Sequence, residues 1–314
     1  MKSNKRSLLL GALIVGAASL FSSLGVAADP SAADSRRVGR STVYKHLPDN
    51  SLEKVTAPDY IKSIGARPGN YAPTEIWRAL EHGETVECLD CIPGISKLLY
   101  DPHPKTREIS AWWLRRRVFG VFGPGEVYAK TVATLTNRSA LERDRAYAAE
   151  ALGEFLSRSG VKFVAAALAS DPSPMVRKSS AAALERLNHQ GPNGELGNAL
   201  GDDNEEVKLA ALQASVRIHV FTHVDKVLTL ISDPSARVRK RAAENLGVMR
   251  SRDSVVGLVA LTSSATEKDA GVRAAAVASL GRIADKGARP AVEAALQDPA
   301  PFVRDAARIS LRRL

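Results

Sequence analysis

Cys88 and Cys91 form the motif with the greatest capacity for chemistry in this sequence. A Cys-x-x-Cys pair can form a disulfide, act as a redox centre or hold a metal. Covalent haem attachment requires a histidine directly after the second cysteine, but Ile92 stands there, which excludes it. Zinc requires two further ligands, which His82 and His103 could supply, although this spacing is not a recognised zinc signature. We interpret the pair as a local structural disulfide, with redox and metal-binding roles as alternatives.

A cluster of tryptophan and arginine is the second candidate site. Trp112 and Trp113 are followed by Leu114 and then by Arg115 and Arg116. Aromatic residues beside arginine are typical of the energetic centres of protein interfaces. We therefore predict that these four Trp and Arg residues contact a partner protein. The alternative is that both tryptophans pack beneath an N-terminal cap.

Catalytic patterns are missing from the sequence. It has no nucleophile–base arrangement, no glycine-rich loop that could cradle a phosphate and no paired-carboxylate motif. We therefore expect a protein that is not an enzyme and that carries no cofactor.

A repeated pattern runs through the C-terminal two thirds of the chain. Each unit has an acidic residue, often a proline, and then a basic residue six positions after the acid. The basic residues lie 31 to 38 positions apart, at Arg107, Arg145, Arg177, Lys208, Arg239, Arg273 and Arg304. The unit of Arg145 lacks the acid and has Ser139 in its place. A repeat of this length is typical of helical solenoids.

Each unit reads as two helices joined by a turn. A small residue follows the basic residue by three positions, and a leucine follows it by seven, with Ser215 the exception. These spacings put the small residue and the leucine on one helical face, where a small side chain lets neighbouring helices approach closely. A shorter amphipathic run precedes each turn, as in 161–168 and 255–261. The acid with its proline is suited to end the first helix and cap the second.

The seven basic residues predict a structural ladder. A buried arginine, together with the acid six positions before it, can connect successive repeats. The alternative is that these basic residues bind a ligand.

The segments DPSARVRKRAAENLGVM (233–249) and DPSPMVRKSSAAALERL (171–187) resemble the HEAT repeat superfamily, in particular the short bacterial HEAT-like repeats named after phycobilin lyases. The resemblance covers residues 92–314. It implies an all-α, right-handed α-solenoid of about seven helical hairpins with an N-terminal cap, in which the second helices line the concave face. Deoxyhypusine hydroxylases of this superfamily hold iron with His-Glu pairs, and no His-Glu dipeptide occurs in this sequence.

The N-terminal end predicts export. Lys2, Lys5 and Arg6 precede an apolar run, and small residues precede a cleavage point after Ala28. We expect residues 1–28 to be a cleaved signal peptide, with an uncleaved membrane anchor as the alternative. We expect an extended or partly disordered lead-in over 29–73, a cap and the first repeat helix over 74–100, and the repeat solenoid over 101–314.

The formal net charge of +10 suggests nucleic acid in a cytosolic protein. In an exported protein we expect no nucleic acid, but a protein partner and peripheral contact with an anionic envelope surface. The sequence therefore predicts a non-catalytic scaffold or adaptor in the periplasm or cell envelope. The alternatives are an envelope assembly factor, a redox or metal-handling protein that uses the cysteine pair, and a HEAT-like lyase or oxidoreductase.

Overall fold

The computed structural model describes residues 58–86, 88–117, 125–189, 191–218 and 221–314. All of them belong to the compact unit Asn50–Leu314. This part of the chain contains sixteen α-helices, joined by turns and short 3-10 helices, and no strand. None of its helices is both long and apolar enough to cross a membrane. The predicted all-α fold is confirmed, whereas the predicted signal peptide and most of the predicted lead-in lie outside the described residues.

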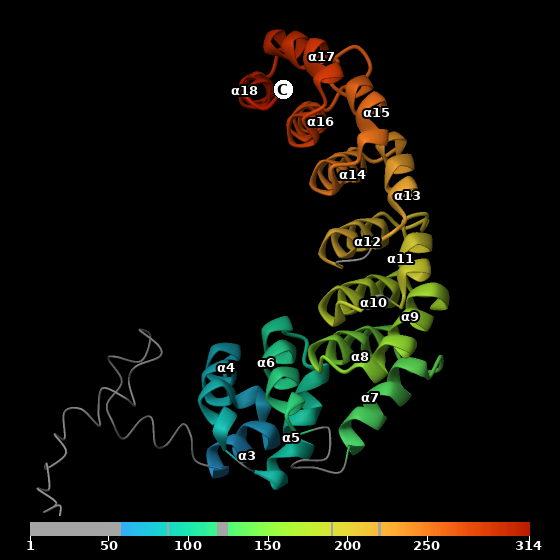
Figure 1. The fold of residues 1–314 in the computed structure, drawn as a ribbon. Helices are drawn as coiled ribbons and strands as arrows, with labels where there is room; N and C mark the ends of the chain where they lie inside the picture. Colours follow the sequence, from blue (N-terminus) through green and yellow to red (C-terminus); the bar gives the residue numbers. More distant parts are fainter. Residues whose placement is uncertain (1–57, 87, 118–124, 190, 219–220) are drawn as a thin grey trace, which may run out of the picture. The chain divides into compact units, whose positions relative to one another are not determined.

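Seven helical hairpins stack side by side, as predicted (Figure 1). The first helices lie on the outer side of the stack and are α5 (Ile92–Lys97), α7 (Glu126–Thr136), α9 (Val161–Ser170), α11 (Asn193–Ala199), α13 (Val224–Thr229), α15 (Val255–Ala260) and α17 (Arg289–Ala294). The second helices lie on the inner side and are α6 (Pro104–Arg115), α8 (Glu142–Glu154), α10 (Pro174–Leu187), α12 (Glu205–Arg217), α14 (Ala236–Met249), α16 (Ala270–Ile283) and α18 (Pro301–Leu311).

A further hairpin precedes these seven and replaces part of the predicted lead-in. It consists of α3 (Pro58–Ala66) and α4 (Pro73–His82), which pack against α5 and α6 respectively. Ile61 and Ile64 of α3 are fully buried. Residues 58–66 of the lead-in, which was predicted to be extended or partly disordered, instead form α3, because these two isoleucines share one helical face and bury it against the next hairpin.

Glycine permits the close contact between α3 and α5. A Cβ atom added to Gly65 would lie 2.8 Å from the backbone of Gly94, and one added to Gly94 would lie 2.9 Å from the backbone of Gly65. Neither position has room for a side chain, so the two helices pack backbone to backbone.

The packing positions predicted from the repeat are buried in the structure. The small residue three positions after each basic residue has no exposed surface. The leucines at seven positions are equally buried in the first five repeats that have one, and Leu311 of the last repeat is half-buried. Ser215 interrupts this row of leucines. Asn245 of the next repeat compensates, because its Nδ2 donates to Ser215 Oγ (3.2 Å) and to the carbonyl oxygen of Leu212 (2.6 Å).

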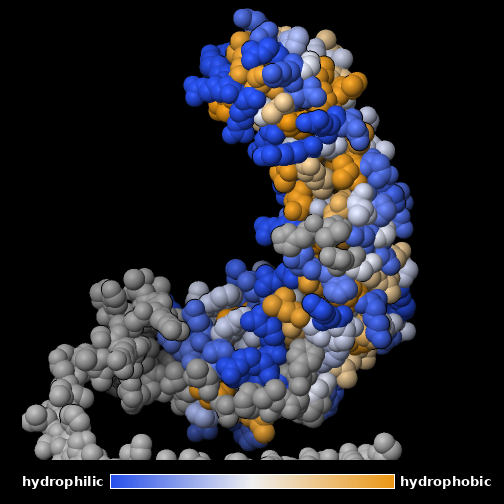
Figure 2. All heavy atoms as spheres, viewed as in Figure 1, coloured by the Kyte–Doolittle hydropathy of each residue, from blue (hydrophilic) through white to orange (hydrophobic). Residues whose placement is uncertain are grey.

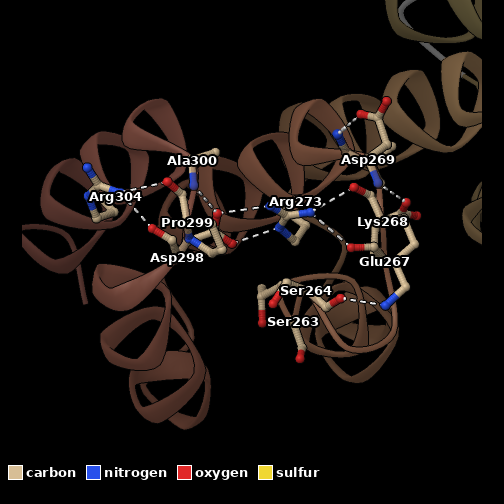
Figure 3. Close-up of polar contacts among 12 residues, drawn as sticks. Ser263, Ser264, Glu267, Lys268, Asp269, Arg273, Asp298, Pro299, Ala300 and Arg304 are labelled. Atoms are coloured by element: carbon tan, nitrogen blue, oxygen red, sulfur yellow. Dashed lines mark hydrogen bonds and ion pairs between the residues drawn. The ribbon is translucent and has the colours of Figure 1, made fainter.

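An ion-pair ladder connects the second helices, and Arg273 shows its geometry (Figure 3). Nη1 of Arg273 donates to the carbonyl oxygens of Glu267 and Lys268, both at 3.0 Å. Nε and Nη2 donate to the two carboxylate oxygens of Asp298, at 2.7 and 2.9 Å. The corresponding pairs elsewhere are Arg145–Asp171, Arg177–Asp202, Lys208–Asp233 and Arg239–Glu267.

The pairing within the ladder differs from the prediction. Each arginine was expected to act together with the acid six positions before it, but its carboxylate partner is the acid of the following repeat. The acid six positions before Arg273 contributes its backbone carbonyl, while the carboxylate comes from the following repeat. That carboxylate also accepts the backbone N–H two residues later, from Ala300 (2.8 Å). The hydrogen bond from Arg273 lowers the pKa of Asp298. Each rung therefore fixes a turn and joins two repeats at once.

Candidate functional site

The ladder is interrupted between the first and second repeats. Asn137 follows α7 as Asp171 follows α9, and its Oδ1 accepts the N–H of Ser139 (3.0 Å) as Asp171 Oδ1 accepts that of Ser173 (2.9 Å). The turn in this repeat is two residues longer than in the other repeats. The position six residues before Arg145 is therefore Ser139, whereas the structural equivalent of the acid lies eight residues before it. The residue that takes the place of the acid is therefore Asn137, which has no charge to offer an arginine.

Arg107 consequently finds a different partner. Its Nε donates to Glu150 (2.9 Å), which lies on the inner side of α8, and its guanidinium group lies 3.8 Å from the ring centre of Tyr147. Its Nη1 still donates to the carbonyl oxygens of Asp101 and Pro102, as Nη1 of Arg177, Arg239 and Arg273 donates to two carbonyl oxygens. The contact with Glu150 therefore joins α6 to α8 where the ladder lacks its carboxylate.

A groove of about 330 Å³ opens between α6, α8 and α10 at this interruption. Three buried alanines line it, namely Ala111, Ala151 and Ala183. Charged side chains from all three helices, Arg107, Glu108, Glu150, Glu154 and Arg186, line it as well. An apolar surface framed by charged groups is suited to hold side chains of another molecule.

Glu154 is a buried carboxyl group at the edge of this groove. Burial raises the pKa of Glu154, and the nearby carboxylate of Glu108 raises it further, while its ion pair with Arg186 acts in the opposite direction. A carboxyl group held in this way at the edge of a groove is typical of binding sites.

A second groove of about 520 Å³ adjoins the first along the inner side. It lies between α10, α12 and α14 and shares the exposed Ala182 with the first groove. Glu206 within it pairs with both Lys178 (2.8 Å) and Arg237 (3.0 Å). On the face that Figure 2 shows, hydrophilic and hydrophobic side chains are interspersed along this inner side.

Trp113 lies in the core and not on the predicted partner-binding surface. Its side chain is fully buried, its Nε1 donates to the carbonyl oxygen of Gly83 (2.8 Å), and Arg117 stacks on its ring at 3.6 Å. It therefore fixes the segment after α4 to α6, and has no surface to offer a partner.

The other three members of the predicted patch reach the surface to different degrees. Trp112 is half-buried against the core, and Arg115 is half-buried as well. Arg116 is exposed and pairs with Glu84 at 2.8 Å. A role for these three residues in partner binding stays a prediction.

Cys88 and Cys91 are joined by a disulfide in the structure, with their Cα atoms 5.3 Å apart. Cys91 is 1% exposed and is the last residue of a 3-10 turn that packs against α3. His82 is half-buried, which lowers its pKa, and His103 is exposed. The described residues contain no group of three or more His, Cys, Asp or Glu side chains placed to hold a metal, so the proposed four-ligand set is not assembled.

Sequence comparison identifies one family. A family model described as HEAT repeats matches residues 129–214 and 224–312, together more than half of the chain. No curated protein matches the sequence.

Solved structures share the helical arrangement. The YibA protein of E. coli is 17% identical, with 89% of this chain and 97% of that chain covered and a TM-score of 0.53. Kap95p, in a structure of its complex with RanGDP, is 12% identical, with 83% of this chain and 42% of that chain covered and a TM-score of 0.59. The phycocyanin lyase complex of CpcE and CpcF from Nostoc is 20% identical, with 71% and 86% covered and a TM-score of 0.39.

Proposed function

Because the chain belongs to the HEAT-repeat family, we propose that it is an exported, non-catalytic scaffold that binds a partner protein along the inner side of its helical stack. The observation that carries the proposal is the pair of adjoining grooves that run from α6 to α14. Kap95p, which has a similar fold, binds a protein. A solenoid offers this kind of extended inner surface to partners.

The contacts of the charged groups support a binding role over a catalytic one. Arg107 is held by Glu150, and Arg186 is held by Glu154, so both arginines of the first groove already have carboxylate partners within it. Ala182 separates the two grooves with a small, exposed side chain. A partner segment that follows the inner side from one groove to the next must pass this residue.

Replacing Ala182 with arginine should reduce partner binding by about tenfold or more, because the larger side chain blocks the passage between the grooves. The measurement is affinity capture of partner proteins from the envelope fraction of the source cells, quantified by mass spectrometry.

Ala166→Arg is the matched control, since Ala166 is an exposed alanine of the outer helix α9. The control variant should recover as much partner as the unaltered protein, and both variants should keep its melting temperature. Equal recovery with Ala182→Arg and the unaltered protein would contradict the proposed binding surface.

The export part of the proposal rests on the sequence of residues 1–28. The intact mass of the protein isolated from its own cells should correspond to a chain that begins at Asp29, and it should be about 2 Da below the mass of the dithiol form. A chain that retains residues 1–28 would contradict cleavage. Free thiols would favour the alternative in which Cys88 and Cys91 take part in redox or metal chemistry.

A further inference from the structure

Arg304 of α18 has the two carbonyl contacts of Arg177, Arg239 and Arg273, but lacks their carboxylate partner. Its Nη1 donates to the carbonyl oxygens of Asp298 (2.7 Å) and Pro299 (3.0 Å), as Nη1 of Arg273 donates to the carbonyls one repeat earlier (Figure 3). Its Nε and Nη2 have no acceptor among the described residues, whereas the same atoms of Arg273 hold Asp298.

The two carbonyl contacts leave the free edge of the Arg304 guanidinium oriented for a ligand. Three arginines of the ladder, Arg177, Arg239 and Arg273, combine these two carbonyl contacts with a carboxylate that spans Nε and Nη2. A planar guanidinium recognises a carboxylate in this way through two parallel hydrogen bonds. Because two hydrogen bonds already hold the Arg304 side chain in place, it loses little further rotational freedom when a carboxylate binds.

The surroundings of Arg304 also favour an anion. α18 carries Arg308 on the same helix and is followed by Arg312 and Arg313, all three exposed, while its one acidic residue, Asp305, pairs with Arg308. This end of the described stack is therefore positively charged, and it attracts acidic groups.

A second copy of this chain does not offer a matching acid at its other end. The turn between α3 and α4, residues 67–72, contains no Asp or Glu. Among the described residues, the nearest acid to this turn is Glu75 of α4, whose carboxylate accepts the N–H of Ala72 (2.8 Å). A second copy that stacked its α3–α4 hairpin on α18 would therefore bring no turn acid to Arg304, which favours a different protein as the source of the carboxylate.

We propose that Arg304 is a carboxylate-binding site that accepts an Asp or Glu side chain of the partner protein at the α18 end of the stack. The acid takes the place that the next repeat's acid occupies inside the ladder. The inference rests on the proposed partner-binding function for the identity of the ligand, but not for the existence of the site.

Acetate is a probe that tests the site alone. In NMR spectra of the ¹⁵N-labelled full chain, the Nε–H signal of Arg304 is identified as the one that is missing from the Arg304→Lys variant. The chemical shift of this signal should change and then level off as sodium acetate replaces sodium chloride at constant ionic strength. The signal of Arg273 should stay in place, because its carboxylate is already bound. A signal for Arg304 that moves no further than that of the exposed Arg282 would overturn the proposal.

Partner capture tests the source of the carboxylate. Arg304→Gln should lower recovery of the partner about threefold or more, whereas Arg282→Gln, a matched change at an exposed arginine of α16, should not. A partner whose recovery depends on Ala182 but is unchanged by Arg304→Gln would leave the proposed function intact and refute this inference. A chain dimer that forms through Arg304 would also refute it.

Discussion

Replacing Arg273 with alanine should lower the free energy of unfolding by about 3–5 kcal/mol, because Asp298 would keep its charge in a buried site without the cation that holds it. The side chain of Asp298 is 2% exposed and that of Arg273 is 5% exposed, so both charges lie away from bulk water. The variant also leaves the carbonyl oxygens of Glu267 and Lys268 without their donor. Urea denaturation followed by circular dichroism measures the change.

Arg304→Ala is the matched control, because it removes an arginine that has the two carbonyl contacts but no carboxylate partner among the described residues. It breaks two hydrogen bonds to carbonyl oxygens but strands no buried carboxylate, so a loss of about 1–2 kcal/mol is expected. If the two variants lost equal stability, the carboxylate contact would contribute nothing and the ladder would be incidental to the fold.

The stability gained from Asp298 should also depend on pH. Its pKa is lowered by the hydrogen bond from Arg273, so its contribution is present above the ordinary Asp pKa of about 3.9 and is lost as pH falls through the lower folded value. In Arg273→Ala the main cause of the lowered pKa is gone, and only the N–H of Ala300 and the charge of Arg304 still lower it. Below pH 4, stability should therefore fall more steeply in the unaltered protein than in the variant.

The repeat architecture could be predicted because each position of the repeat has one physical role. A small residue at the closest contact between helices and a leucine in the groove beside it recur at fixed spacing, and both are buried in the structure. The acids and arginines also recur, so a ladder could be predicted. Its pairing could not, because an acid six positions before an arginine in sequence does not reveal whether its carboxylate or its carbonyl faces that arginine.

The first groove was harder to predict, because it results from an exception to the repeat. Asn137 takes the structural place of an acid, but the longer turn moves it out of alignment in the sequence. Nothing in the sequence pattern distinguishes Glu150 and Tyr147 from other exposed positions, and only the structure shows that Arg107 contacts both. The hairpin formed by α3 and α4 was missed for a related reason. This hairpin lacks the basic residue that every later repeat has in the first turn of its second helix. The buried Ile76 stands at that place in α4.

Trp113 shows where composition alone misleads. Aromatic residues beside arginine are typical of protein interfaces, but the same side chains also form buried cation–π contacts inside a protein. Here Arg117 stacks on the ring of Trp113 and donates to the carbonyl oxygens of Glu84 and Val86 (2.8 and 2.9 Å), which closes the segment after α4 over the ring.

Replacing Trp113 with alanine should destabilise the N-terminal hairpins by about 3–5 kcal/mol, since a fully buried indole is lost. The carbonyl oxygen of Gly83 would lose its donor, and Arg117 would lose the ring on which it stacks. Because each repeat contacts only its neighbours, the effect should stay local. Hydrogen exchange followed by mass spectrometry should show faster exchange in α4 and α6 but unchanged exchange in α14 and α16.

Trp112→Ala is the control that shows whether the effect of Trp113→Ala comes from the burial of Trp113 or from the loss of any tryptophan in α6. Trp112 is the adjacent residue, is half-buried and sits on the same helix, so its replacement should cost less stability and leave α4 largely protected. Equal exchange in the two variants, or unchanged exchange in Trp113→Ala, would show that the indole does not hold the α3–α4 hairpin in place. Trp112→Ala could also weaken partner capture while the fold stays intact. The proposed binding surface would then extend beyond the two grooves to the N-terminal end of the described stack. Trp113 would contribute to that surface only by holding α6 in position.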